Sequence, residues 1–295
     1  MKYQCDLHIH SAFSPDALDS PKKIVAAAKK KKLKAIAIAD HNGTLGLAQM
    51  KRHCRRAKID SLEGIEISSR YKKIDMHILG YALNFDQALL HKKLSPLIAG
   101  YNLRAKKLFA NAQKAGLIDK NINFNNYFCR KNKLYVATRE IQKLVADQNH
   151  IPYPEAEKLL GRGSRLYVKM PPQGLLDPKK TSALIHASGG ISVIAHPYYI
   201  VRNPLAKMNP KKYLLKIIKY GGFDGIEAYY PKHTAAEERL FLQIAREKHL
   251  IVTGGSDWHG KAFTPERPIG CRGVTQGELE KIIIVLLKKY GRTAA

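Results

Sequence analysis

The segment Asp6-Leu7-His8-Ile9-His10 combines the apolar alternation of a buried strand with two histidines. Alternate residues of a strand point to one face, so His8 and His10 point together while their apolar neighbours point into the core. Two neutral imidazoles held side by side can bind one zinc, manganese or iron ion. A lone His-x-His pair is usually structural, because such short motifs often occur by chance. The other ionisable residues therefore decide between a metal site and two ordinary histidines.

Residues of metal-binding types recur where the later strands are expected to end. Together with the first two histidines they form a set of nine: His8, His10, Asp16, His41, Glu66, His77, His196, Asp257 and His259. Barrel folds gather their catalytic groups at the carboxyl ends of their strands, so we expect these side chains on one rim. The set is larger than a single ion needs, which predicts a multinuclear site bridged by the carboxylate of Glu66. Five histidines on predicted helices are interpreted as structural: His53, His91, His150, His186 and His249.

Short apolar strands that alternate with amphipathic helices are predicted to position these residues. Strands are expected at 6–10, 35–39, 62–68, 75–83, 191–195, 225–229 and 251–253, the third and fourth forming a hairpin. Helices are expected from Pro21, with Ser20 as N-cap, and at 45–57, 211–220, 235–249 and 276–290. This rhythm is typical of an α/β barrel wrapped by helices. Residues 87–180 break the rhythm, so we predict a barrel formed by 1–86 and 181–295 with a mostly helical insert at 87–180.

The charge of the chain favours anionic partners. Its 295 residues, enough for one large domain with an insert, carry a net charge of +27. Such a field attracts phosphorylated metabolites, nucleotides or nucleic acid, although a lysine-rich solvated surface gives the same count. The four cysteines form no Cys-x-x-Cys pair and are expected to be reduced thiols. The chain shows no apolar signal segment and no apolar run longer than 282–287, so we expect a cytoplasmic protein without a membrane partner.

Five segments resemble the motifs of the PHP family, named after polymerase and histidinol phosphatase. They lie in order along the chain, at residues 6–17, 39–42, 64–67, 195–197 and 255–259. The resemblance implies a distorted seven-stranded β/α barrel, similar to a TIM barrel, with a centre of three divalent zinc, manganese or iron ions. All the residues that match the family's ligands are present, which argues against a PHP domain that has lost its activity.

The resemblance also implies how the ligands are shared among the three ions. The first ion would be held by His8, His10, Glu66 and Asp257; the second by Glu66, His77 and His196; the third by Asp16, His41 and His259. Asp40 is expected to orient a ligand histidine, as carboxylates around metal centres commonly do.

Other segments resemble the branch of the family that hydrolyses nucleoside 3′,5′-bisphosphates and the 5′ ends of short RNAs. They lie at residues 137–139, 161–163, 167–168 with 171–172, 225–230 and 233–234. The sequence departs from this branch at Ile141, where a histidine is usual. The candidates for binding a phosphate are Arg139, Arg162, Arg165, Lys169 and His233. Guanidinium groups in particular match the geometry of phosphate oxygens. Ordinary surface charge explains each of the basic residues alone equally well.

The expected activity is metal-dependent phosphoester hydrolysis, in which bound cations activate water and neutralise the phosphoryl oxygens. Asp257 and His233 are the candidate catalytic residues, and the leaving group takes its proton from His233 or from water. The favoured substrate is a nucleoside 3′,5′-bisphosphate or a short RNA 5′ end. Two alternatives stay open at this point: a phosphatase for a small metabolite such as histidinol phosphate, and a non-catalytic nucleic-acid-binding module.

Overall fold

The structure, a computed structural model, describes residues 3–128, 133–171, 175–206 and 208–291. Cys129 and Pro172, which entered the sequence arguments, lie outside these ranges. One seven-stranded sheet follows chain order from β1 to β7 and is nearly closed into a barrel. Its strands are β1 (Cys5–Ile9), β2 (Ala35–Ile38), β3 (Asp60–Tyr71), β4 (Ile74–Ala82), β5 (Ile191–Ile194), β6 (Gly225–Tyr229) and β7 (Ile251–Gly254).

The sheet is parallel except at β4, which pairs antiparallel with both β3 and β5. The two edge strands, β1 and β7, form no ladder with each other, and the seam between them is bridged just beyond β7. There the backbone N–H of His10 donates to the carbonyl of Trp258 at 2.9 Å, and the N–H of Asp257 donates to that of His8 at 2.7 Å. All seven expected strands are present, and the α/β barrel expected from the sequence is confirmed.

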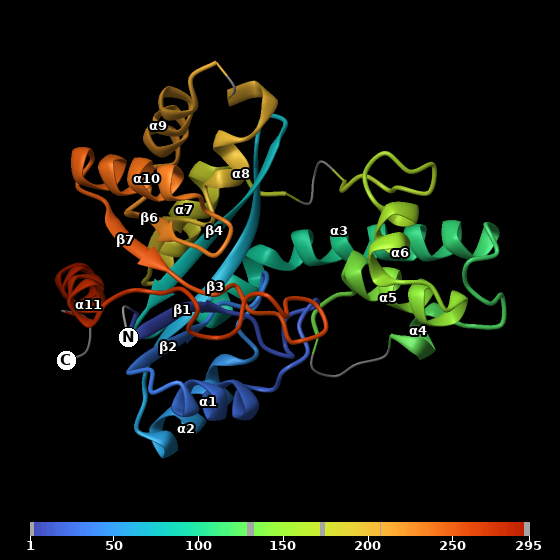
Figure 1. Cartoon of the computed structure of the whole chain (residues 1–295), viewed down its shortest axis with the longest axis horizontal. Coiled ribbons are helices and arrows are strands. Elements are labelled where there is room, and N and C mark those ends of the chain that lie inside the picture. The colour runs from blue at the N-terminus through green and yellow to red at the C-terminus, as the bar shows by residue number, and fades with distance from the viewer. Residues whose placement is uncertain (1–2, 129–132, 172–174, 207, 292–295) are drawn as a thin grey trace.

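Helices surround the sheet, and most of the chain between β4 and β5 projects to one side of it (Figure 1). The helices of the barrel are α1 (Pro21–Lys30), α2 (Leu47–Ala57), α7 (Pro178–Ala187), α8 (Tyr198–Val201), η2 (Pro204–Ala206), α9 (Pro210–Gly221), α10 (Ala235–Glu247) and α11 (Gln276–Tyr290). Between β4 and α7 lie α3 (Gln87–Lys114), α4 (Phe124–Tyr127), α5 (Thr138–Asn149) and α6 (Tyr153–Leu160). Among the described residues, no helix has the length and apolar character needed to span a bilayer.

The strands bury apolar side chains on both faces, as expected for a sheet covered by helices. In β2, Ile36 and Ile38 belong to a cluster that includes side chains of α1, α2, α9 and α10. The alternate residues Ala35 and Ala37 belong to a second cluster, to which α11 contributes Ile282. Local sequence fixes the helix starts: Ser20 caps α1 by accepting the N–H of Lys23, as its sequence predicted. These packed layers hold the strand ends, and hence the polar residues that follow them, in fixed positions.

The stretch expected to form an insert contains a hydrophobic cluster of its own. The second half of α3 contributes Leu108 and Phe109 to this cluster, whereas its first half packs Leu94 against the barrel. Ile141 of α5 is fully buried in the same insert cluster. The departure from the nucleotide branch at this position therefore has a physical reason, since the isoleucine packs the core of the insert. The division of the chain at residues 87 and 180 stays a prediction.

Candidate metal centre

The carboxylate of Glu66 lies at the centre of the candidate site. Its backbone is fixed on both sides, because the N–H of Glu66 donates to the carbonyl of Asp40 and its carbonyl accepts the N–H of Asn42. The side chain is 1% exposed, so its charge is balanced within the protein. Five imidazoles lie within 3.4 Å of its two oxygens: His77 and His196 at Oε1, and His8, His10 and His41 at Oε2. Glu66 thus has the geometry of a bridging ligand.

A first cluster unites β1 with the loop after β7. Its members are His8, His10, Glu66 and Asp257, whose ligand atoms all lie within 4.8 Å of one another. The Oδ1 atom of Asp257 is 3.2 Å from Nε2 of His10 and 3.5 Å from Nε2 of His8. These four residues are the ones that the resemblance implied for the first ion.

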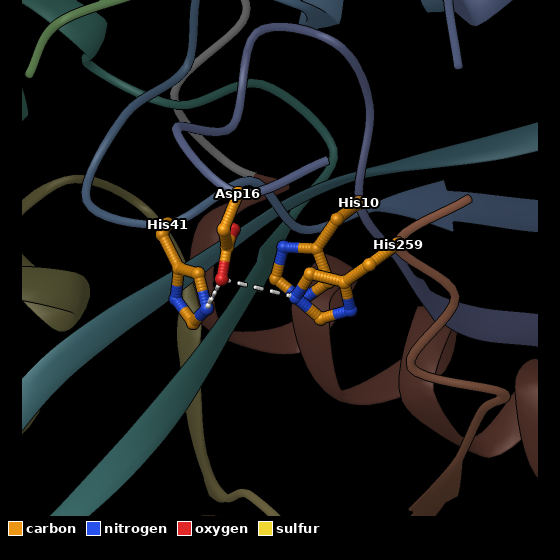
Figure 2. A group of neighbouring side chains, drawn as sticks. All are labelled: His10, Asp16, His41 and His259. Carbon is orange, nitrogen blue, oxygen red and sulfur yellow. Dashed lines mark ion pairs between the residues drawn. The ribbon is translucent and has the colours of Figure 1, made fainter. Parts of the chain in front are cut away.

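A second cluster joins the loop after β1 to the ends of β2 and β7. Figure 2 shows the carboxylate of Asp16 directed between two imidazoles, with Oδ2 at 3.5 Å from Nε2 of His41 and 3.4 Å from Nε2 of His259. His10 stands close by, and its ring stacks on that of His259 with centroids 4.1 Å apart. The structure therefore brings together the three residues expected at the third ion and adds His10 to them.

A third cluster contains His41, Glu66 and His77. His196 was expected here with Glu66 and His77. It does lie at Glu66, with Nε2 at 2.9 Å from Oε1, but the tighter group contains His41 in its place. His77 lies on β4, which pairs antiparallel with β3, the strand that carries Glu66. All nine expected residues thus lie in one connected group, while their division among ions stays a prediction.

The donor set fits divalent cations. Three of its buried atoms make no hydrogen bond, although each lies within 3.4 Å of another ligand atom: His41 Nδ1, Glu66 Oε2 and His259 Nε2. Buried polar atoms are nearly always satisfied, so three orphans in one site indicate a missing positive partner. Burial lowers the pKa of His41 to about 3, which keeps the imidazole in the neutral form that binds metals. Burial alone would raise the pKa of Glu66, but the surrounding histidines hold it well below its usual value.

Two of the candidate ligands follow strands in left-handed backbone conformations. His196, after β5, has φ of 27°, and Asp257, after β7, has φ of 53°. Non-glycine residues adopt such conformations rarely and at a cost, and functional sites are one place where they gather. Both residues stand where the chain leaves a strand, and both side chains contact the clustered residues.

A cavity of about 220 Å³ opens onto the three clusters. Its walls are formed by His41, Glu66, Asp75, Met76, His77, Arg139, His196, Tyr199, Asp257 and His259. Arg139, from the first turn of α5, lies on this wall with Nη1 at 3.3 Å from Oδ2 of Asp16. The insert therefore places a guanidinium beside the metal-type residues, in a cavity wide enough for a phosphate group.

Residues 6–254 match the PHP domain family. The chain belongs to the PHP family. It is 27% identical over 273 residues to a 5′-3′ exoribonuclease of Haemophilus influenzae, covering 88% of this chain and 91% of that protein. It is 27% identical over 288 residues to a 3′,5′-nucleoside bisphosphate phosphatase of Chromobacterium violaceum, covering 95% of this chain and 97% of that protein.

A solved structure supports the same fold. It is that of a Bifidobacterium adolescentis protein to which metal-dependent phosphoesterase activity has been attributed, and it matches with a TM-score of 0.82 at 22% identity, over 97% of this chain and 96% of that one. The family membership and the enzyme class expected from the sequence, metal-dependent hydrolysis of phosphoric esters, are thereby confirmed.

The other basic residues expected to bind phosphate do not line the cavity. Arg162 is exposed and pairs with Asp75 of the cavity wall, with Nη2 at 3.2 Å from Oδ2. Arg165 and Lys169 are exposed and are not among the residues that line the cavity. The structure therefore favours Arg139, and next Arg162, as contacts for a substrate bound at the centre.

His233 lies behind aromatic rings instead of on the cavity wall. It is 7% exposed, its Nδ1–H donates to the carbonyl of Ala228 at 2.8 Å, and its ring packs on Phe241. Burial lowers its pKa to about 4, so the imidazole is neutral at pH 7 and its Nε2 can only accept a proton. This geometry counts against the expectation that His233 donates a proton to the leaving group.

Glu227 of β6, to which the sequence assigned no role, contacts two of the candidate ligands. It is fully buried, and its Oε1 accepts the Nδ1–H of His8 at 2.8 Å. Its Oε2 accepts the backbone N–H of His196 at 2.6 Å. Asp40, which was expected to orient a histidine, instead accepts the N–H and hydroxyl of Ser11 at 2.6 and 2.7 Å. The orienting carboxylate of this PHP site is therefore Glu227, and its signal in the sequence was an acidic residue inside an apolar strand.

Arg267 and Tyr230 hold the side of Asp257 that faces away from the histidines. The Nη1 of Arg267 donates to Oδ2 of Asp257 at 2.5 Å, and the hydroxyl of Tyr230 donates to the same oxygen at 2.9 Å. Arg267 is 4% exposed, so this charged contact is shielded from water. The pair leaves Oδ1 of Asp257 directed at His8 and His10. No sequence pattern pointed to Arg267, which lies in the loop between β7 and α11.

Proposed function

We propose that this PHP chain hydrolyses nucleoside 3′,5′-bisphosphates and the 5′ ends of short RNAs. The observation that carries the proposal is Arg139, a cation from the insert that shares one cavity with the histidine–carboxylate clusters. A substrate with two phosphates can place one at the clusters and the other at this guanidinium. The two relatives described above act on nucleotides or RNA, which supports the same class of substrate.

The nine clustered residues would hold three divalent manganese, zinc or iron ions, with Glu66 shared between two of them. Such ions supply an activated water and neutralise charge on the phosphoryl oxygens. The chain itself positions the reactants. Asp257 is held by Arg267 and Tyr230 at Oδ2, so that its Oδ1 stays directed at the two histidines of the first cluster. Arg139 binds the phosphate that is not cleaved.

The leaving group takes its proton from water in the cavity. His233, the alternative donor, is neutral at pH 7 and lies outside the cavity wall. Its hydrogen bond to Ala228 fixes the tautomer in which Nε2 carries no proton. We assign His233 to packing behind Tyr230, which in turn contacts Asp257.

We further propose that the enzyme works in the cytoplasm on anionic phosphorylated substrates. Its net charge of +27 favours their encounter. Cys5, Cys54 and Cys271 are free thiols among the described residues, which fits a reducing compartment.

A panel of phosphoesters tests the proposal on manganese-loaded protein. The readouts are free phosphate from the phosphate monoesters and nucleotides from the RNA, because hydrolysis of a phosphodiester releases no free phosphate. The substrates are adenosine 3′,5′-bisphosphate, adenosine 5′-monophosphate, histidinol phosphate and a short 5′-phosphorylated RNA. A substrate without the second phosphate lacks the charged contact to Arg139, so we expect the bisphosphate to exceed the monophosphate in kcat/KM by on the order of 10²–10⁴. A higher kcat/KM for histidinol phosphate would replace the nucleotide assignment with the small-metabolite alternative. Absence of free phosphate from the monoesters and of nucleotides from the RNA would favour a non-catalytic binding module.

A further inference from the structure

One aromatic side chain on the wall of the catalytic cavity has no part in the chemistry described so far. Tyr199 belongs to α8, the short helix that follows the candidate ligand His196, and it is 51% exposed. Its ring meets that of His196 edge to face, with centroids 5.1 Å apart and an angle of 83° between the planes. An aromatic ring is thus half open to the cavity, next to a residue that contacts Glu66 at 2.9 Å.

The ring of Tyr199 is backed by the buried rings of Tyr198 and Tyr230 and by the exposed guanidinium of Arg202. The ring of Tyr198 lies 4.1 Å from it, and Tyr198 is only 6% exposed. Tyr198 in turn stacks on Tyr230 at 5.5 Å, and the guanidinium of Arg202 lies 4.7 Å from its ring centroid. Arg202 is fixed by two contacts of 2.7 Å to Glu237. A surface built this way is organised before any ligand arrives, which favours binding because little freedom is lost.

We propose that Tyr199 is the platform on which the nucleobase of the substrate stacks. The proposal rests on the proposed function and adds the base to the groups that the site recognises. A phosphate at the clusters and a planar ring on Tyr199 would be separated by the single imidazole of His196, and a nucleotide carries both groups on one sugar. Bases stack readily on exposed aromatic side chains, with little preference for sequence, because every base presents a π face.

Direct binding tests the platform without turnover. Calorimetry on manganese-loaded protein would compare non-hydrolysable phosphonate analogues of adenosine 3′,5′-bisphosphate and of 1-deoxyribose 3,5-bisphosphate, which has the same phosphates and no base. Tyr199→Ala should weaken binding of the adenosine ligand about 5- to 100-fold and leave the abasic ligand within about twofold. Tyr199→Phe keeps the ring and should bind both ligands like the wild type. Tyr127→Ala removes a comparably exposed tyrosine that does not line this cavity, and should change neither affinity.

The outcomes separate the platform from the phosphoesterase function. The platform is overturned if Tyr199→Ala weakens binding of both ligands equally or of neither. It is also overturned if the wild type does not bind the adenosine ligand. A second arm measures phosphate release from the two parent bisphosphates by manganese-loaded protein. Base-dependent binding without any phosphate release would keep the platform and overturn the proposed function. Equal kcat/KM for the two parent bisphosphates would keep the function and overturn the platform.

Discussion

Glu227 and His8, 219 positions apart in the chain, are joined by a hydrogen bond of 2.8 Å at Nδ1 of the imidazole. The other ring nitrogen, Nε2, faces the carboxylates of Glu66 and Asp257. The second oxygen of Glu227 accepts the backbone N–H of His196. One buried carboxylate on β6 therefore fixes a candidate ligand from β1 and the position of another after β5. Carboxylates that orient ligand histidines in this way usually contribute strongly to metal affinity.

The substitution Glu227→Gln should weaken metal binding while keeping the fold. It preserves the shape of the side chain but removes the charge that orients and polarises His8. We expect a loss in metal affinity of about 10- to 100-fold. Titration of metal-free protein with manganese measures the affinity, and circular dichroism measures folding. Unchanged affinity would show that Glu227 serves only the packing of β6.

The substitution Glu66→Gln tests the bridge. It removes the charge shared by five imidazoles, so we expect loss of at least one ion and near-complete loss of phosphoesterase activity. Elemental analysis and phosphate release are the two measurements. Glu63→Gln is the matched control, because Glu63 is also buried on β3 but pairs with Lys51, and its substitution should leave metal content unchanged. Turnover at the wild-type rate by the Glu66 variant would place the bridge elsewhere.

The number of ions distinguishes a multinuclear centre from a single site. Protein purified without chelator, or reconstituted with manganese or zinc, should contain more than one ion per chain, because three overlapping clusters of ligand atoms are present. Elemental analysis against protein concentration gives the ratio directly. A ratio of one or less after reconstitution would contradict the trinuclear assignment.

Arg139→Ala should mainly raise KM for adenosine 3′,5′-bisphosphate. A hydrogen bond between charged groups commonly contributes enough to change KM about 10- to 100-fold. An aryl phosphate reaches only the clusters and should be affected much less. Arg165→Ala is the control, since Arg165 is an exposed arginine of the same insert that does not line the cavity. Equal losses on both substrates would locate Arg139 at the reacting phosphate or in the scaffold.

The strands and the nine clustered residues could be predicted because both depend on local patterns. Alternation such as that in Ala35–Ile38 marks a strand, and the type of residue at the end of the strand marks its chemistry. Contacts made across the barrel leave no such pattern. Arg267 contacts Asp257 from a loop, and Tyr199 is exposed only because of how α8 leaves β5. The sharing of His10 between two clusters likewise depends on the distance between β1 and the loop after β7, which spacing along the chain does not contain.

The seam between β1 and β7 gives the candidate centre a mechanical role. No ladder of strand pairing closes the barrel there, and its nearest backbone contacts are made by His8 and His10 on one side and by Asp257 and Trp258 on the other. Three of these residues are also members of the first cluster. A cation held by them would cross-link the two sides of the seam. Amide hydrogen exchange at His10 and Asp257 should therefore slow when the ions bind. The exchange rate at the seam would then report whether the candidate centre is occupied.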